Sequence, residues 1–529
     1  MSTPALPDDI ETLKRLLVER DARVEQLTRE LAVTQHESQN LTLLIEKLKL
    51  QIARLKRMQF GRSSERLGEQ LAQLELLVED LEANQAQTAT ETPVSAPPPA
   101  PAVEPRRAWP GHLPRQTVEH LPACNCQACG TALIKIGEDV SEILEYVPAS
   151  FKVIRHSRPK FTCPQCHSFT QAPAPQRPID RGVPGPGLLA HVLVSKFGDH
   201  LPLYRQSQIY AREGVELTRS TLADWVGSCA QLLSPLITAL NQYVLSATKV
   251  HADDTPVPVL EPGRGKTKTG RLWVYVRDDR PAGSTDPPAV WFAYSPDRKG
   301  EHPAWHLRDF SGVLQADAYS GFGQLYVSNR QPGPIREAAC WAHARRKFYD
   351  IYVANNSPLA ADALRRIGTL YEIEADIRGQ APERRMAQRQ QRTDGLLTEF
   401  HQWLSATFHR VSRKSELAKA IGYVLTHWQA LTRYLGDGGI EIDNNAAERA
   451  LRTCAIGRKN WLFAGSDAGG ERAAAIYSLI GTAKLNGLNP EAYLSLVLEH
   501  IAEHPINRVA ELLPWNVAAH LHIEQRLAA

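Results

Sequence analysis

The sequence has no long apolar segment and almost no net charge, and both absences narrow the class of protein. No run of about 18 apolar residues occurs in the 529 residues, so no membrane partner is predicted. The first residues also lack the apolar stretch of a signal peptide, which indicates a cytoplasmic protein. Lysine and arginine number 61 against 58 aspartate and glutamate, so charge alone does not indicate a nucleic-acid binder. No nucleotide-hydrolysis motif is present, so ATP is not implied.

Cysteine is sparse but half of it is arranged in pairs. At this length, with 43% apolar residues, two or more domains are expected. In a cytoplasmic chain, eight cysteines argue for thiols or metal ligands rather than disulfides. Two Cys-x-x-Cys pairs predict one structural Zn²⁺ ion in a zinc-ribbon-like module at 114–178. Strands are predicted between the two pairs, one of them at 151–154. The predicted ligands are Cys126, Cys129, Cys163 and Cys166, with Cys124 as a competing ligand.

The remaining three cysteines are isolated in the sequence and are interpreted as ordinary small buried residues: Cys229, Cys340 and Cys454.

The N-terminal part carries a heptad pattern. From Ile10 as position a, apolar residues recur at a and d as far as Leu55, with polar exceptions at Arg20, Thr34 and Ser38. Such a long, narrow seam predicts self-association through a coiled coil in residues 1–85, with a helix packed on its own protein as the alternative. Residues 86–113 are rich in alanine and proline and predict an extended linker.

Residues 179–245 predict short helices at 186–197, 203–213 and 220–226. Their spacing is similar to a helix-turn-helix, in which Arg219 would stand near the start of a DNA-recognition helix. A three-helix support for the following domain is the alternative.

An α/β domain is predicted at 246–483. Segments 249–260, 270–278 and 288–294 indicate three sequential strands, followed by a helix at 301–309 and a strand at 312–315. A fifth strand is predicted at 335–341. This order opens a ribonuclease-H-like fold. A helical insertion is predicted at about 350–436, and a C-terminal helical element at 484–529.

Three separated acidic segments carry the predicted chemistry. They are His-Ala-Asp-Asp-Thr-Pro at 251–256, the segment 314–322, and Asp-Asn-Asn-Ala-Ala-Glu-Arg at 443–449. Asp253, Asp317 and Glu448 would let three carboxylates share two divalent ions, Mg²⁺ or Mn²⁺. Such a pair supports phosphoryl transfer on nucleic acid. The alternative for Glu448 is a capping box with Asn445, in which its role is structural.

Several segments together resemble one family. They are Phe-Gly-Arg-Ser-Ser-Glu at 60–65, His-Ala-Asp-Asp-Thr-Pro-Val-Pro-Val-Leu at 251–260, Cys-Trp-Ala-His-Ala-Arg-Arg-Lys-Phe at 340–348, and the segment 443–461. The chain resembles the IS66 family (TnpC type) of bacterial insertion-sequence DDE transposases along nearly its whole length. The resemblance implies that Asp253, Asp317 and Glu448 form the triad, with the adjacent Asp254 leaving open which acid faces the ions.

The family resemblance also implies the reaction and the partners. The expected activity is binding of the element's terminal inverted repeats, 3′-end cleavage and strand transfer into target DNA, with small companion proteins of the same element assisting. A ribonuclease-H-fold nuclease that cuts without joining, and an inactive zinc-containing DNA-binding protein, are the alternatives.

Basic residues near the predicted triad are candidates for DNA contact. They are His343, Arg345 and Arg346 at the start of one helix, and Arg449, Arg452, Arg458 and Lys459 after Glu448. For His343 at best a DNA-positioning or supporting role is expected, because two-metal chemistry needs little acid-base help. For Arg452 the alternative is a helical ion pair with Glu448 four residues earlier. The arginines at 383–392 are interpreted mainly as a solvated helix face.

Overall fold

The computed structural model describes residues 151–155, 160–162, 169–171, 176–180, 182–261, 263 and 265–527. The predicted coiled coil, the linker and the four predicted zinc-ligand cysteines lie outside these residues. Strands β1 (Lys160–Thr162) and β2 (Phe169–Gln171), on either side of Cys163 and Cys166 in sequence, pair antiparallel. The strand predicted at 151–154 is wrong, because residues 151–155 have no regular secondary structure and Phe151 packs edge-on against Tyr210 at 5.4 Å.

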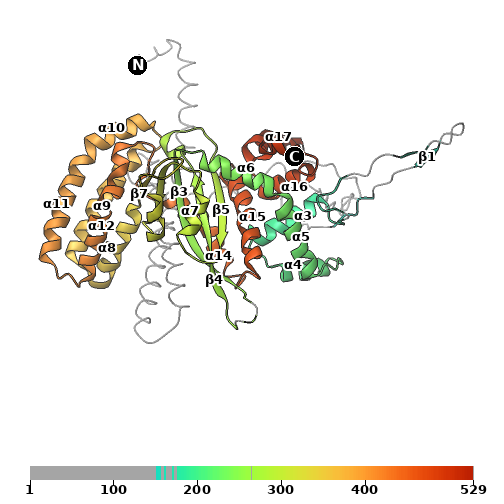
Figure 1. The fold of residues 1–529 in the computed structure, drawn as a ribbon, viewed down its shortest axis with the longest axis horizontal. Helices are drawn as coiled ribbons and strands as arrows, with labels where there is room; N and C mark the ends of the chain where they lie inside the picture. Colours follow the sequence, from blue (N-terminus) through green and yellow to red (C-terminus); the bar gives the residue numbers. More distant parts are fainter. Residues whose placement is uncertain are drawn as a thin grey trace, which may run out of the picture.

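A five-stranded mixed sheet forms the centre of the described structure (Figure 1). Its order is β5-β4-β3-β6-β7. The strands are β3 (Lys249–Val259), β4 (Lys268–Arg277), β5 (Ala289–Ser295), β6 (Gly312–Ala316) and β7 (Ile335–Ala339). The first three form an antiparallel meander, and β6 and β7 run parallel to β3. All five predicted strands are present, and the valine and aromatic residues of β3, β4 and β5 are typical of buried strands.

Helix α15 (Asp467–Leu485) covers the outer strand β5. The Phe292 amide donates to Ser478 Oγ at 2.8 Å, and Thr482 Oγ1 accepts from the Val290 amide at 3.1 Å and donates to its carbonyl. Gly481 permits this approach, because a Cβ there would lie 2.6 Å from Val290 Cγ1. Side-chain hydroxyls therefore satisfy backbone groups of an edge strand that would otherwise lack partners.

The remaining helices on the α15 side share one core with the sheet. They are α3 (Pro186–Phe197), α4 (Leu203–Arg212), α5 (Arg219–Leu232), α6 (Ser234–Leu245), α14 (Asn445–Gly457), α16 (Pro490–His500) and α17 (Pro514–Leu527), with short 3-10 turns at Arg280–Ala282 and Ile506–Leu512. One cluster of buried apolar residues extends over these helices and the sheet, from Leu189 of α3 to Leu521 of α17. Helix α3 packs on α16, so segments far apart in sequence build a single hydrophobic unit (Figure 1).

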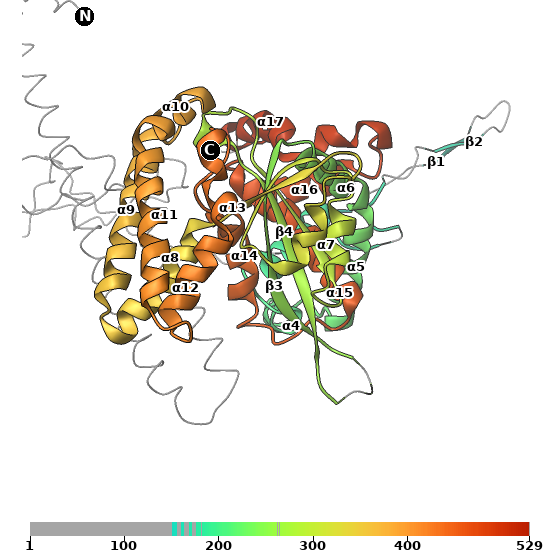
Figure 2. The same cartoon turned by 60° about the vertical axis from the view of Figure 1, so that its left-hand side comes forward.

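A helical layer stands on the opposite side of the sheet (Figure 2). It consists of α8 (Trp341–Asn355), α9 (Pro358–Ile377), α10 (Pro382–Arg392), α11 (Asp394–Arg410), α12 (Glu416–Thr426), α13 (Trp428–Thr432) and the 3-10 turn Arg433–Gly436. These helices bury a second apolar cluster that includes Val313 of β6 and Ala339 of β7. The helix predicted at 301–309 is present as the shorter α7 (Glu301–His306). A 3-10 turn at Ser320–Leu325 follows β6.

Two arginines of the predicted solvated face are in fact buried. Arg385 and Arg389 of α10 are 1% and 0% exposed. Arg389 forms a two-pronged ion pair with Glu374 at 2.7 Å and donates to the carbonyls of Tyr434 and Ile440. Arg385 likewise bonds to Glu374 and to the Gly438 carbonyl. The partners of the two arginines are between 11 and 53 residues away in sequence, so no local sequence pattern predicts these contacts. The pair fixes the turn before α14 to the helical layer.

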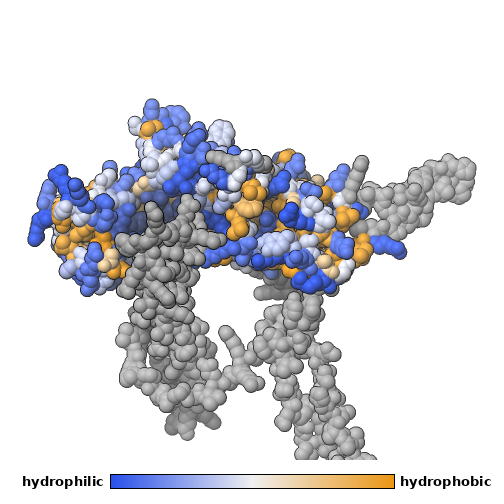
Figure 3. Space-filling model, turned by 90° about the horizontal axis from the view of Figure 1, so that it is seen from below, coloured by the Kyte–Doolittle hydropathy of each residue, from blue (hydrophilic) through white to orange (hydrophobic). Residues whose placement is uncertain are grey.

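The described surface seen from below is mainly hydrophilic with separate apolar areas (Figure 3). Singly exposed apolar residues such as Trp305 and Ile506 are ordinary on a protein surface. Among the described residues, no helix is both long and apolar enough to cross a bilayer.

Candidate active site

Asp253 and Asp317 follow directly from the pairing of two parallel strands. His251 of β3 stands opposite Gln315 of β6. Asp253 comes two residues after His251 and is still on β3. Asp317 comes two residues after Gln315, just after β6 ends. Since neighbouring parallel strands are about 4.8 Å apart, this register brings the two carboxylates to the same place at the end of the sheet.

The adjacent acid, Asp254, is engaged elsewhere. Successive strand residues point to opposite faces, so Asp254 turns away from Asp253. Its carboxylate is 2% exposed and pairs with Arg271 at 3.0 Å and with Arg298 at 2.8 Å. Of the two adjacent acids, Asp253 is the one that neighbours Asp317.

A tight turn fixes the direction of the Asp317 side chain. Ala318 has a φ of 61°, a left-handed conformation that a residue with a Cβ adopts rarely. The turn lets Asp317 Oδ1 accept a hydrogen bond from the Tyr319 amide at 3.1 Å. Backbone strain of this kind is concentrated at functional sites.

The two carboxylates repel one another. Burial raises the pKa of Asp253 well above its usual range, and the Asp317 carboxylate raises it further. The amide of Asp254 donates to Asp253 Oδ1 at 2.7 Å and opposes the shift. A cation between the acids would remove the repulsion.

Helix α14, which carries Glu448, is attached to β3 at its beginning and its end. Asn444 immediately before the helix donates from Nδ2 to the Ala252 carbonyl at 2.8 Å, and its Oδ1 is 3.1 Å from His251 Nδ1. At the other end, the Arg458 guanidinium donates to the carbonyl of Pro256. The helix that presents Glu448 is therefore fixed relative to the strand that presents Asp253.

The capping box predicted for Glu448 does not form. Helix α14 begins one residue earlier than that motif requires, with Asn444 at the N-cap and no side-chain cap hydrogen bond. Asn445 instead donates from both its amide groups to the Asp443 carboxylate. Asn445 and Glu448 therefore do not form the predicted capping box.

The segment before α14 is held by the core of the sheet. Both backbone groups of Glu441 bond to the buried Gln315 side chain on β6. The Glu441 carboxylate pairs with Arg385 at 2.9 Å, and the Trp341 amide donates to the Ile442 carbonyl. Charged partners lower the pKa of Glu441 against the opposing effect of burial.

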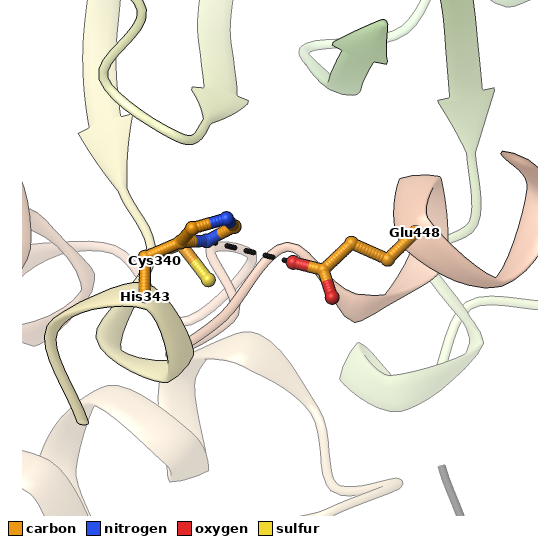
Figure 4. Close-up of side chains that lie close together, drawn as sticks. All are labelled: Cys340, His343 and Glu448. Carbon is orange, nitrogen blue, oxygen red and sulfur yellow. Dashed lines mark ion pairs between the residues drawn. The ribbon is translucent and has the colours of Figure 1, made fainter. Parts of the chain in front are cut away.

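His343 on α8 lies next to Glu448 on α14. Its Nδ1 lies 3.5 Å from Glu448 Oε1, and burial lowers its pKa while the charge of Asp317 opposes that shift. His343 therefore lies beside one of the three predicted acids and within electrostatic reach of another. In Figure 4 the imidazole and the Cys340 thiol face the Glu448 carboxylate.

Most of the chain matches known protein families. Residues 181–472 match the family described as Transposase IS66 family. The chain belongs to this family. Three further segments match other parts of IS66 transposases: 123–167 the zinc-finger binding domain, 478–515 the C-terminal element, and 47–118 the part described as Transposase C of IS166 homeodomain.

Relatives of this IS66-family chain occur in Sinorhizobium fredii (strain NBRC 101917 / NGR234). The uncharacterized protein y4hP is 43% identical over 491 residues, which is 88% of each chain. The uncharacterized protein y4qI is 38% identical over 531 residues, 97% of each chain. The family membership and these full-length relatives agree with the resemblance inferred from sequence motifs.

The predicted DNA-contact residues of this IS66 transposase occupy several positions. Arg449 and Lys459 on and after α14 are exposed, and Arg452 is half-buried. Arg345 and Arg346 are half-buried on α8. Arg219 is exposed in the first turn of α5, whose N-cap is Thr218, on the opposite side of the sheet from the helical layer (Figure 1).

Some residues beside the acids were not singled out from the sequence. Arg298 binds Asp254, stacks on the Tyr319 ring at 4.0 Å, and lowers the pKa of Asp253. It comes from the loop after β5, a position that no motif marks. Cys340 and Asn444 lie within separate family-like segments, and only the fold brings the Asn444 amide to the Cys340 sulfur.

Proposed function

We propose that the protein is a DNA transposase that binds the terminal inverted repeats of its element, cleaves the 3′ strands in a metal-dependent reaction and joins them to target DNA. The catalytic residues are Asp253, Asp317 and Glu448. The observation that carries this proposal is the β3–β6 register, which makes the first two acids neighbours, together with the attachment of α14 to β3. Family membership gives the reaction class.

The catalytic core is proposed to be ribonuclease-H-like. Its support is the sheet order β5-β4-β3-β6-β7, with a three-strand antiparallel meander followed by parallel strands. The helices between β7 and α14 form the insertion that separates the second acid from the third.

The acids suit two hard divalent cations. All three offer carboxylate oxygen, which Mg²⁺ and Mn²⁺ prefer, and Asp253 is buried next to a like charge. When bound, such ions activate a water or a 3′-hydroxyl and neutralise developing charge on the phosphate. Asp253 and Asp317 would hold the ions from the sheet, and Glu448 from the helix.

Other side chains position these groups and the DNA. Arg298 balances the charge of the acids, and His343 orients Glu448. The exposed Arg449 and Lys459 would contact phosphates, with Arg345, Arg346, Arg452 and Arg458 supplying further positive charge nearby. Arg219 on α5 would contact DNA separately, at the start of a recognition helix.

The N-terminal parts would organise the complex. Cys126, Cys129, Cys163 and Cys166 lie within the zinc-finger match and are proposed to hold one structural zinc ion. Residues 1–85 would pair two copies, and 114–178 with 179–245 would recognise the element's ends.

Replacing Glu448 by glutamine tests the proposal. Glu448→Gln preserves side-chain size but removes the charge that holds a cation, so essentially all Mg²⁺-dependent strand cleavage should be lost while folding and end binding persist. Glu471→Gln, which removes a carboxylate from exposed α15 surface, is the matched control and should cleave normally. The assay is cleavage and joining of labelled element ends, with circular dichroism and gel shift as checks.

Each other outcome has a defined meaning. Substantial cleavage by Glu448→Gln would disprove its role and direct attention to Asp443, followed by Glu441. Cleaved ends without joined product in the wild type would redefine the protein as a nuclease. End binding without any Mg²⁺- or Mn²⁺-dependent cleavage would indicate an inactive DNA-binding protein.

A further inference from the structure

A second type of metal-binding arrangement overlaps the carboxylate site. Cys340, His343 and Glu448 each present a ligand atom, and these atoms lie within 4.8 Å of one another. The sulfur is fully buried and the other two side chains are half-buried. Figure 4 shows the sulfur and the imidazole, both from the start of α8, directed toward the carboxylate on α14.

The chemistry of these donors differs from that of the three acids. A thiolate, an imidazole and one carboxylate form a mixed sulfur, nitrogen and oxygen set. Zn²⁺ and Co²⁺ accept such sets in tetrahedral sites, with a fourth position open to water, whereas Mg²⁺ requires oxygen ligands.

The three ligands are held in place without an ion. Cys340 Sγ accepts a hydrogen bond from the Asn444 amide at 3.2 Å, which connects the N-cap of α8 to that of α14. The Trp341 amide bonds to the Ile442 carbonyl and reinforces the same connection. His343 Nδ1 is shielded from solvent with no hydrogen-bond partner, yet it lies only 3.5 Å from Glu448 Oε1. A buried nitrogen in this state is a group for which a ligand is expected.

We propose that Cys340, His343 and Glu448 bind a thiophilic divalent ion of the zinc type, and that this ion withdraws Glu448 from the Mg²⁺ site and inhibits cleavage. The inhibitory part rests on the proposed function, while the binding part does not.

Cobalt titration of the full-length protein tests the binding. With the structural zinc left in place, added Co²⁺ should produce a sulfur-to-cobalt charge-transfer band that saturates at about one equivalent, as a single site requires. Cys340→Ser should abolish the band, and the serine hydroxyl can still accept from the Asn444 amide, which preserves the fold. Cys454→Ser, a buried cysteine on α14, is the matched control and should keep the band.

His343→Ala supplies a second variant. Loss of a group that merely supports a metal ligand weakens affinity by about 10- to 100-fold, so loss of a ligand should weaken cobalt binding by at least about 10-fold. A wild-type protein without the band, or a band that persists in Cys340→Ser, overturns the proposed site.

Zinc inhibition is measured separately. Micromolar Zn²⁺ should suppress Mg²⁺-dependent cleavage by the wild type and by Cys454→Ser, and Cys340→Ser should cleave in Mg²⁺ alone and resist the added zinc. Equal inhibition of Cys340→Ser would overturn the inhibitory part. If the wild type cleaves nothing under any condition, the proposed function fails, and the cobalt titration still decides whether the metal site exists.

Discussion

At the residue scale, two adjacent aspartates have opposite relations to stability. Asp254 makes charge-assisted hydrogen bonds to two arginines, so Asp254→Asn should lower the free energy of unfolding by about 2 kcal/mol. Asp253 is buried beside another carboxylate, so Asp253→Asn should not lower stability in the absence of metal. Urea unfolding in EDTA, with cleavage assays beside it, measures both.

The two substitutions control one another, because they make the same chemical change at neighbouring positions. Asp253→Asn should abolish cleavage, whereas Asp254→Asn should retain cleavage below its unfolding temperature. If Asp254→Asn is inactive while fully folded and Asp253→Asn cleaves, the assignment of the two acids is reversed.

A buried histidine away from the acids gives a pH dependence. His306 Nδ1 and the Tyr275 hydroxyl form a hydrogen bond at 3.0 Å, and burial lowers the pKa of His306 to about 3 from the ordinary 6.5. The unfolded chain binds this proton near pH 6.5 and the folded chain does not, so stability falls as the pH is lowered from about 6.5 toward 3. At pH 5 the loss should be roughly 2 kcal/mol.

His306→Gln isolates this contribution, since the glutamine amide can keep a hydrogen bond to Tyr275 but does not titrate. Its stability should change less between about pH 7 and 5 than that of the wild type, by roughly the same 2 kcal/mol. His409→Gln, on the exposed end of α11, should leave the pH dependence as it is. Parallel curves for wild type and His306→Gln would contradict the prediction.

At the scale of elements, helix α10 is predicted to hold the insertion together through one arginine. Arg389→Met leaves the buried Glu374 with Arg385 alone and leaves three backbone carbonyls short of a donor. The expected loss is about 3–5 kcal/mol, typical of breaking a buried ion pair. Urea unfolding followed by fluorescence of the tryptophans in the insertion measures it.

Arg384→Met is the control on the same helix. Its side chain is exposed, so a change within about 0.5 kcal/mol is expected. Equal effects of the two substitutions would mean that helix propensity or net charge, rather than the buried contacts, is responsible.

The sheet was more predictable from the sequence than the contacts between elements. Strands β3 to β5 were predicted because valine and aromatic residues mark them locally, and β6 because it is a short apolar run. The capping box at Asn445 was wrong because the preceding residue, Asn444, is fixed by Ala252 and His251, nearly 200 positions earlier. Arg385 and Arg389 were assigned to the surface for the same reason, since their partners are distant in sequence. Likewise, Asp253 could be distinguished from Asp254 only when Arg271 and Arg298 were located.

At the scale of the whole molecule, self-association is expected to depend on the N-terminal heptads. The outer strand β5 is already covered by α15, which prevents a second copy from extending the sheet there. Deleting residues 1–67 should therefore reduce self-association and the pairing of two ends more than binding to one end. Light scattering gives the mass of each form.

A point substitution in the full chain refines this test. Leu48→Asp places a charge at a d position of the seam and should reproduce the deletion, whereas Glu46→Gln at the adjacent b position should not. An unchanged oligomer mass for the deletion would assign self-association to another part of the molecule.

The path of the chain through the insertion also affects when the protein becomes active. Asp253 and Asp317 lie on and just after neighbouring strands of the sheet, but Glu448 follows only after the helices α8 to α13 and a turn anchored by Gln315, Arg385 and Arg389. During translation, a nascent chain stopped within the insertion carries two of the three acids. The proposed activity is thus withheld from incomplete translation products, because a frameshift or early stop before Glu448 yields a protein that lacks the third acid of the proposed site.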